Sequence, residues 1–238
     1  MSGMGATLDQ LPSRPPMKER TEPATAPSTA EPARTRDSDR SQQAILCAAV
    51  AEFAQYGLGG ARMERIAERA KVDKRLIYYY FKNKDSLFLA VLEGTYKRIR
   101  EAESDLRLSE LPPVEAVRRL TEFTWKYHVE HPEFVTLLNS ENLHGARHLS
   151  QSKHIREMNS PLIQMLGEIL ERGRIEGVFR GGVDPVQLYI SIAGLAYFYV
   201  SNNATLSAIF GRSLMTPKAL NERLSHVNDM ILGYLMRD

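Results

Sequence analysis

The chain has 238 residues, of which 43% are hydrophobic and 25% are charged. These fractions are those of an ordinary globular protein of one or two domains, and the formal net charge of +2 is too small to indicate a partner. A single cysteine, Cys47, excludes both an intramolecular disulfide framework and a cysteine-based zinc site. It also fits a reducing compartment.

Hydropathy predicts a cytoplasmic protein without a membrane partner. No apolar run reaches the roughly 18 residues that span a bilayer. The first stretch, "MSGMGATLDQLPSRPPMKER", lacks the apolar core of a signal peptide.

Residues 1–36 are predicted to form a disordered tail. They contain six of the twelve prolines and no aromatic residue, so they bury too little surface to offset the entropy of ordering. At the end of this segment Arg34, Arg36 and Arg40 precede the first helix, where a flexible basic arm can reach DNA. A tail that only aids solubility is the alternative.

Residues 37–84 are predicted to form a helix-turn-helix domain. Helical periodicity begins near Ser38 and ends at Gly57. Two short helices follow, at 63–70 and 74–80, with three residues between them. This spacing is typical of a helix-turn-helix.

The second short helix has an apolar side and an outer side. Ile77 and Phe81 are four residues apart and are expected to face inward, which leaves the outer side to a set of basic and tyrosine residues: Arg75, Tyr78, Tyr79 and Lys82. Residues 34–84 hold 11 Lys or Arg and 6 Asp or Glu, a balance of +5, whereas the remaining 20 and 23 give −3. Cations neutralise phosphate and tyrosine hydroxyls bond phosphate or base edges, so this face indicates a DNA reader. A solvated helix face or a half-buried tyrosine patch is the alternative.

The stretch "GARMERIAERAKVDKRLIYYYFKNKDSLFLAVL" resembles the DNA-binding signature of TetR-family transcriptional regulators, over roughly residues 40–92. The matching features are the Ile66-Ala67 pair, the turn at Val72, the aromatic residues from Tyr78 to Phe81, and "KNKDSL" at the entry to a fourth helix. The resemblance implies that helix 74–80 enters the major groove, and that Lys74, its first residue, is one of the DNA-binding residues. It further implies base contacts by Arg75, Leu76 and Tyr78, and backbone contacts by Arg62, Tyr80 and Lys84.

Two positions depart from the family pattern. Ala61 stands where the family usually has threonine or serine, so a side-chain cap on the helix that follows is expected to be missing. Lys71 replaces the turn glycine, at a cost of about 1 kcal/mol if this residue is left-handed. Arg62 or Lys71 can supply the lost phosphate contact with a longer cationic side chain.

Residues 85–238 are predicted to form a second, all-helical domain for effector binding and dimerisation, which makes the fold class all-α. The expected helices include a long fourth one from Lys84 to about Leu108, two opened by Pro113 and Pro132, one from Pro185 through Leu206, and two at 153–175 and 216–236. This part of the sequence shows no alternating strand pattern and no internal repeat. The likeness to the family's ligand-binding domains rests only on helix number and order.

Apolar stripes on two helices suggest a homodimer. One stripe comprises Leu220, Leu224, Val227, Ile231 and Leu235, and the other comprises Leu188, Ile192 and Leu195 beside the small residues Ala193 and Gly194. Burial of each stripe inside one subunit is the alternative, but the family resemblance favours a dimer on a palindromic operator.

Polar and aromatic residues interleave in the second domain and are candidates for lining an effector pocket: Trp125, His128, Asn142, Tyr197 and Asn202. A small aromatic or heteroaromatic metabolite suits ring stacking with them. His144 and His148 are four apart, a spacing that can hold a metal, although surface histidines are commoner. We expect no metal and no cofactor.

The sequence therefore predicts a ligand-responsive repressor that binds double-stranded operator DNA. A transcriptional activator of the same fold is the alternative. An all-helical enzyme is a weaker one, because the glycines of "GLGG" and "RGG" follow no strand and no serine elbow or metalloprotease motif occurs. A helical partner-binding module would leave the basic tyrosine helix unexplained.

Overall fold

The structure is a computed structural model that describes residues 31–236, without the side chains of residues 31–36. Residues 1–30 of the predicted tail and the side chains of Arg34 and Arg36 therefore lie outside the described residues. The last six residues of the predicted tail, and Arg40, belong to a helix that begins at Glu31, so the predicted start of the first helix near Ser38 is too late. The described part is all-α, and its elements are α1 (Glu31–Gly60), α2 (Met63–Ala70), α3 (Lys74–Phe81), α4 (Lys84–Ser104), η1 (Leu108–Glu110), α5 (Pro113–Glu130), α6 (Pro132–Leu143), η2 (Leu149–Gln151), α7 (Lys153–Ile175), α8 (Pro185–Ser201), α9 (Asn203–Phe210) and α10 (Pro217–Leu235). None of these helices is long and apolar enough to cross a membrane.

Helix starts follow local sequence signals. Proline occupies the first turn of α5, α6, α8 and α10, where a missing N–H costs nothing. Side-chain oxygens accept a backbone N–H at the start of five helices: Asp73, Asn83, Ser152, Asp184 and Thr216. At Gly57 the backbone turns to φ 64° and ψ 176°, which breaks the first helix where the sequence predicted its end.

The first core lies among α1, α2, α3 and the first turns of α4, a unit we call the head. Phe53 of α1 meets Phe88 of α4 edge to face, with ring centroids 5.0 Å apart. α6 also takes part, because Leu137 belongs to this core and the hydroxyl of Ser140 accepts the N–H of Leu58 at 3.3 Å. The head therefore packs directly on α6.

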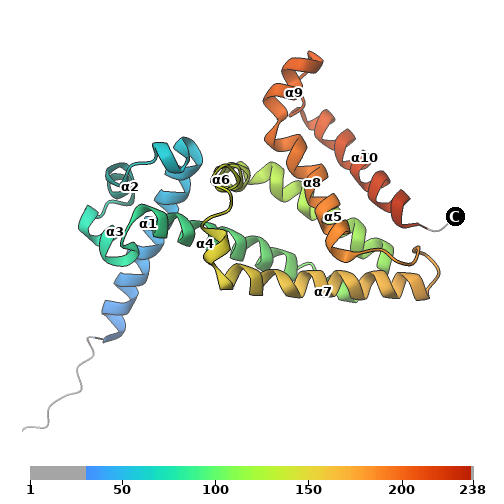
Figure 1. The fold of residues 1–238 in the computed structure, drawn as a ribbon, viewed down its shortest axis with the longest axis horizontal. Helices are drawn as coiled ribbons and strands as arrows, with labels where there is room; N and C mark the ends of the chain where they lie inside the picture. The colour runs from blue at the N-terminus through green and yellow to red at the C-terminus, as the bar shows by residue number, and fades with distance from the viewer. Residues whose placement is uncertain (1–30, 237–238) are drawn as a thin grey trace, which may run out of the picture.

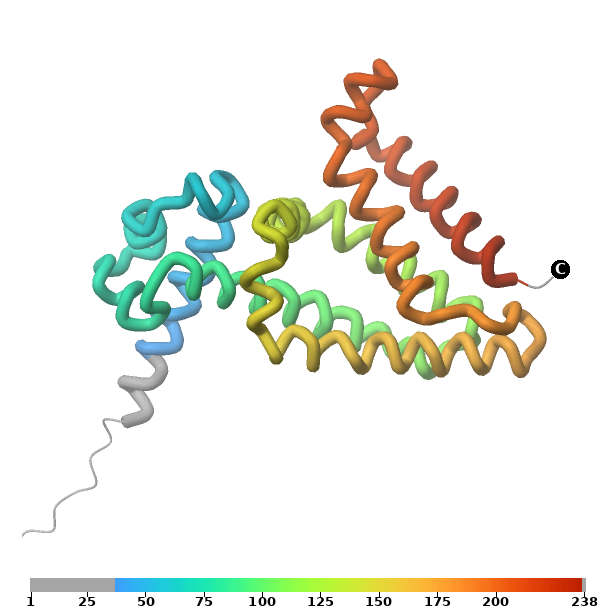
Figure 2. The backbone as a smooth tube through the Cα atoms, in the orientation of Figure 1, coloured from blue at the N-terminus to red at the C-terminus, as the bar shows by residue number. Residues whose placement is uncertain are grey.

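The second core lies among α5, α7, α8 and α10, which with α6 and α9 form what we call the body. In Figure 1, α7 runs along one edge of the body, and α8, α9 and α10 rise from it on the side away from the head. Figure 2 shows α4 leaving the head and running into the body.

The apolar stripes proposed for dimerisation are used mainly inside the subunit. Five stripe residues are buried in the body core: Leu188, Ile192, Val227, Ile231 and Leu235. Because these side chains are buried within one subunit, they do not form an exposed dimer face as predicted, although Leu188 and Ile231 also line a groove between α8 and α10. Different residues of α8 and α10 remain exposed, among them Ile190, Phe198, Met230 and Tyr234.

The helix expected from Pro185 through Leu206 is two helices. α8 ends at Ser201, and Asn202 takes the non-helical ψ of 11° before α9 begins. The Asn202 side chain donates to the carbonyl of Phe198 at 3.0 Å and to the hydroxyl of Ser201 at 2.8 Å. Asparagine competes in this way with helical hydrogen bonding, which ends α8 here.

Candidate nucleic-acid interface and ligand cavity

The turn between α2 and α3 fixes the direction of α3. Lys71 closes α2 in the left-handed conformation (φ 55°, ψ 42°), and the N–H of Val72 returns to the carbonyl of Ala67 at 3.0 Å. Asp73 then caps α3 by accepting the N–H of Arg75 at 2.7 Å. Lys71 therefore has the left-handed conformation, which costs a residue other than glycine about 1 kcal/mol.

One side of α3 is anchored in the head and the other is open. Ile77 is fully buried, and Phe81 packs half-buried against the same core. Tyr78 is 42% exposed and Tyr79 78% exposed, while Arg75 is also exposed. Leu76 is half-buried beside them. The open side thus presents a cation and phenol groups on a rigid helix, as a major-groove reader requires.

Three of the candidate DNA contacts already have partners within the protein. Lys74 pairs with Glu64 and lies over the ring of Tyr78, with Nζ 5.6 Å from its centroid. The Tyr80 hydroxyl donates to Ser38 at 3.1 Å, and Lys84 Nζ donates to the carbonyl of Ala61 at 3.3 Å. An ammonium has three N–H groups, so Lys84 keeps donors for a phosphate. Arg62, the seventh candidate, is exposed.

The start of α2 is held by a residue that sequence reasoning did not single out. Arg62, which precedes α2, has no capping bond from its own side chain, but its N–H donates to Glu52 of α1 at 3.0 Å. Glu52 also accepts from Arg65 Nε at 2.7 Å. Burial alone would raise the pKa of Glu52, but these bonds hold it below its ordinary value. A carboxylate from α1 therefore satisfies the backbone N–H of the residue that precedes α2, although no side chain caps the first N–H groups of α2 itself.

A cavity of about 350 Å³ lies among α4, α5, α6 and α8. Its lining includes three of the five predicted effector residues, His128, Asn142 and Tyr197. Trp125 does not line it, and its ring instead lies tilted against that of Tyr199 at a centroid distance of 5.3 Å. Asn202 is not in the lining either, since it ends α8.

Further lining residues were not predicted: Tyr96, Ile99, Thr124, Phe134, Leu138, Glu141, Leu149, Tyr189, Ile190, Ala193 and Gly194. Thr124 had a visible signal, because it lies one helical turn before His128 and so shares its face. Burial raises the pKa of Tyr96 to about 12, which keeps its phenol neutral. The cavity is thus mostly apolar and aromatic, with a few polar groups, as small-molecule sites are.

Glu141 connects this cavity to the start of α4. Its Oε1 accepts the N–H of His148 at 2.8 Å and of Leu149 at 2.9 Å, and its Oε2 lies 2.6 Å from His148 Nδ1. The other ring nitrogen of His148 lies 3.1 Å from Asp85 of α4. Both ring contacts are hydrogen bonds only when the imidazole carries two N–H groups. The hydrogen bond from His148 holds the pKa of Asp85 below its ordinary value.

His144 and His148 do not share a ligand position. His144 Nδ1 bonds the carbonyl of Ser140 at 2.6 Å, whereas His148 faces two carboxylates. Among the described residues no group of three or more His, Cys, Asp or Glu side chains is placed to hold a metal.

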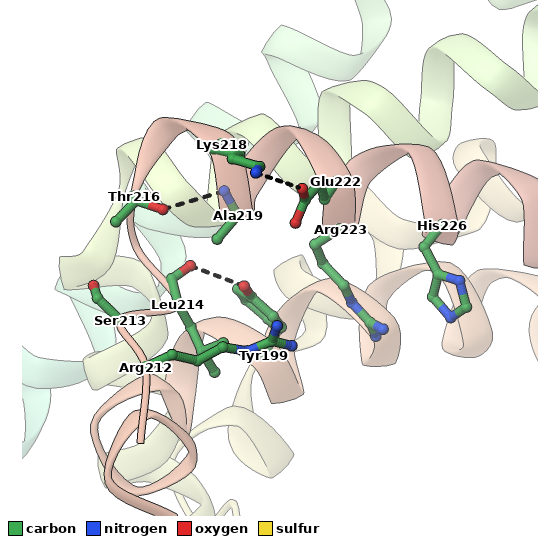
Figure 3. A pocket seen from close by; sticks show the side chains of 10 residues that line it. All are labelled: Tyr199, Arg212, Ser213, Leu214, Thr216, Lys218, Ala219, Glu222, Arg223 and His226. Atoms are coloured by element: carbon green, nitrogen blue, oxygen red, sulfur yellow. Dashed lines mark hydrogen bonds and ion pairs between the residues drawn. The ribbon is translucent and has the colours of Figure 1, made fainter. Parts of the chain in front are cut away.

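A larger cavity, of about 530 Å³, lies between the end of α8 and the start of α10 (Figure 3). Its charged lining residues are Arg212, Lys218, Glu222 and Arg223. The Tyr199 hydroxyl donates to the carbonyl of Leu214 at 2.8 Å across its floor. Because these groups are mainly charged and lie at the surface, the cavity does not enclose an apolar ring, and we favour the aromatic cavity as the ligand site.

Family models match both parts of the chain. Residues 45–91 match the model described as bacterial regulatory proteins, tetR family, and residues 113–231 match the model described as tetracyclin repressor-like, C-terminal domain.

Named relatives and solved structures agree with these matches. The chain is 40% identical over 204 residues to the HTH-type transcriptional repressor NicS of Pseudomonas putida, covering 86% of this chain and 96% of that protein. It is 34% identical over 141 residues to the HTH-type transcriptional repressor SCO4008 of Streptomyces coelicolor, covering 59% and 70%. A TetR family transcription regulator from Marinobacter aquaeolei has the same fold, with a TM-score of 0.63, 21% identity, and coverage of 86% and 100%.

Proposed function

Because the chain belongs to the TetR family of DNA-binding transcriptional regulators, we propose that it is a cytoplasmic repressor, not an enzyme, that binds a palindromic operator as a homodimer. A small molecule in the body then releases it from DNA. The observation that carries the DNA-binding part is the open side of α3, where exposed Arg75, Tyr78 and Tyr79 stand opposite the buried Ile77.

The proposed DNA-binding residues divide into those that contact base edges and those that contact the DNA backbone. Arg75, Leu76 and Tyr78 meet base edges, because they occupy the open side and the start of the helix that enters the groove. The backbone contacts come from residues around that helix: Arg62, Lys74, Tyr80 and Lys84. Lys84 bonds the carbonyl of Ala61 and keeps two N–H groups for a phosphate at a fixed distance from α3. Tyr80 donates its single hydrogen to Ser38, so it must give up that bond to donate to a phosphate.

The aromatic cavity is the effector site in this proposal. His128, Asn142 and Tyr197 line it and serve as effector contacts, and a small aromatic or heteroaromatic metabolite fits its ring-rich walls. Trp125 and Asn202 lie outside the cavity, so they affect effector binding only through neighbouring residues.

Coupling between cavity and head runs through α4. Asp85 in its first turn bonds His148, whose partner Glu141 lines the cavity. Farther along α4, Arg100 donates to the hydroxyl of Tyr189 at 2.9 Å, and Tyr189 lines the same cavity. A ligand that prefers a different position of these groups shifts α4 and with it the spacing of the two α3 helices in the dimer. A hundredfold preference corresponds to about 2.7 kcal/mol of coupling, within the usual allosteric range.

The test is an electrophoretic mobility shift with DNA from upstream of the protein's own gene. If each subunit neutralises about three to five phosphates, log affinity falls against log salt with a slope of roughly −5 to −9. Tyr78→Ala should weaken specific binding, whereas Tyr56→Ala, an exposed tyrosine outside α3, should not. Affinity that is insensitive to salt would contradict the proposal.

A further inference from the structure

The aromatic cavity has one polar corner, formed by Thr124 and His128 of α5, whose hydrogen-bonding capacity the protein leaves unused. Both residues are almost fully buried, with 2% and 4% of their surface exposed. They lie one turn apart on the same helix face and both line the cavity. The corner is therefore held on a rigid element within reach of a ligand.

Hydrogen bonding fixes the tautomer of His128. Its Nδ1 lies 2.7 Å from the carbonyl oxygen of Thr124, and a carbonyl only accepts, so Nδ1 carries the hydrogen. Burial lowers the pKa of His128, which favours the neutral ring. The neutral ring leaves a lone pair on Nε2, and among the described residues no group donates to it. His128 is thus an acceptor without a donor.

The Thr124 hydroxyl is unpaired as well. Its Oγ1 is buried and has no hydrogen-bond partner among the described residues. By contrast, the hydroxyl of Thr121, one turn earlier, donates to the carbonyl of Val117 at 2.9 Å. A buried hydroxyl without a hydrogen-bond partner costs free energy, so a ligand that bonds the Thr124 hydroxyl would remove this cost.

Three other polar residues around the cavity have partners within the protein. Both oxygens of Glu141 accept from the 148–149 segment, and the Tyr197 hydroxyl donates to Asn139. Tyr189 accepts from Arg100. Most of the remaining wall is apolar or aromatic, and Phe134 stands edge to face with His128 at a centroid distance of 5.6 Å. Apart from the exposed amide of Asn142 and the phenol of Tyr96, a ligand therefore meets uncommitted polar groups only at the Thr124–His128 corner.

We propose that the effector is a small planar ring compound that donates an N–H or O–H group to Nε2 of His128 and offers a second polar contact to the hydroxyl of Thr124. This inference rests on the proposed function, because it defines the ligand class of the same cavity. A ring of matching shape without a hydrogen-bond donor leaves the Nε2 lone pair unpaired and binds less tightly.

Phenol and anisole are suitable probes, because they share a ring and differ in whether the oxygen carries a hydrogen. Ligand-observed NMR titrations with the full chain give a dissociation constant for each. We expect phenol to bind at least tenfold more tightly than anisole, a difference of about 1.4 kcal/mol.

Three variants assign this preference to the corner. His128→Phe removes the acceptor but keeps an aromatic ring, so the two probes should bind within about twofold of each other. His128→Gln places an amide oxygen near the position of Nε2 and should restore the preference in part. Thr124→Val should weaken phenol binding, whereas Thr121→Val, the same change on a hydroxyl outside the cavity, should leave it unchanged.

Equal affinity of phenol and anisole for the unaltered protein, or no binding of either, would overturn the inference. A preference that survives in His128→Phe would overturn it too, because the donor would then be recognised elsewhere. The mobility shift with upstream DNA uses neither phenol nor anisole, so it tests the proposed function independently of the ligand class. If DNA binds but phenol shows no preference, only the ligand class is wrong, whereas failure to bind DNA would remove the proposed function itself.

Discussion

At the scale of single residues, Gly173 of α7 shows how tightly the body core is packed. A Cβ built on it would lie 2.1 Å from the ring of Phe179, which is 1% exposed. We predict that Gly173→Ala lowers the free energy of unfolding by about 1–3 kcal/mol, because overpacking outweighs the gain in helix propensity. Urea denaturation measures the change.

The matched control is Gly94→Ala in the interior of α4, where an added Cβ meets nothing within 4 Å. This change should stabilise the protein by roughly 0.5–1 kcal/mol. If both variants changed the free energy of unfolding in the same direction, the ring of Phe179 would have to move aside freely in Gly173→Ala.

Glu103 of α4 is a buried carboxyl that titrates near neutrality. Its Oε2 lies 2.8 Å from Arg100 Nη1, but neither of its oxygens has hydrogen-bond geometry with a described group. Burial raises the pKa of Glu103 from 4.5 to about 7, despite the opposing effect of Arg100. The folded protein therefore binds this proton more tightly than the unfolded chain does.

It follows that the free energy of unfolding falls as the pH rises from about 4.5 to about 7, and that the loss is complete above that range. We predict that Glu103→Gln removes up to about 3 kcal/mol of this pH dependence. Urea titrations at pH 5 and pH 8 measure it. Glu101→Gln, an exposed change on the same helix, should behave as the unaltered protein does.

Substitutions of Arg75 and Lys84 should affect DNA binding in different ways. Arg75 carries the forked guanidinium that recognises guanine, so Arg75→Ala should relax specificity at one operator position, at a cost of about 1–3 kcal/mol per half-site. Lys84 offers a point charge beside Ala61, so Lys84→Ala should lower affinity about equally for operator and random DNA. Competition binding assays separate the two effects. If the outcomes are exchanged, α3 is rotated from the register assigned here.

At the scale of helices, local chemistry made most of the fold predictable. Proline at Pro113, Pro132 and Pro185 and the left-handed turn at Lys71 act within a few residues, so periodicity and capping rules located these elements. α2 and α7 have the predicted bounds. The break at Asn202 was missed because an apolar pattern continues on both sides of it.

Contacts between residues far apart in the chain could not be predicted from the sequence. Glu52 reaches across ten positions to Arg62, and Asp85 meets His148 across 63. The apolar side of α10 that carries Val227 and Ile231 is buried in the body core, but its pattern is equally compatible with a dimer interface until the packing is known. Periodicity shows that a helix has an apolar side but not which partner covers it.

The contact between Asp85 and His148 yields a prediction at this scale. His148→Ala breaks the link between α4 and Glu141 and should weaken operator binding about 2- to 30-fold, although His148 lies outside α3. Mobility shifts without any ligand measure this effect, with helix content checked by circular dichroism. His154→Ala, an exposed histidine at the start of α7, is the control. Unchanged DNA affinity in His148→Ala would mean that the contact does not position the head.

At the scale of the whole molecule, a groove of about 430 Å³ between α8 and α10 is the candidate dimer surface. Gly194 and Leu195 line it from α8, and Met230 and Tyr234, about half exposed, line it from α10. Small and apolar residues of this kind allow a second copy's helices to approach closely.

We predict that Met230→Glu shifts the protein to a monomer, because a charge buried at an interface without a partner costs several kcal/mol. Sedimentation velocity measures the assembly state, and the salt slope of DNA binding should fall to about half. Ile175→Glu, an exposed apolar position outside the groove, should leave the dimer intact. A dimeric Met230→Glu would place the interface on another face.

The packing of α1 on α6 limits how regulators of this kind can be recombined. A chimera that joins this head to a foreign sensor within α4 would place an unrelated α6 against Leu58. Leu137 would then be missing from the core of the head, and the N–H of Leu58 would lose the Ser140 hydroxyl. A working exchange of sensors must therefore carry these two α6 residues along with the first 92 positions.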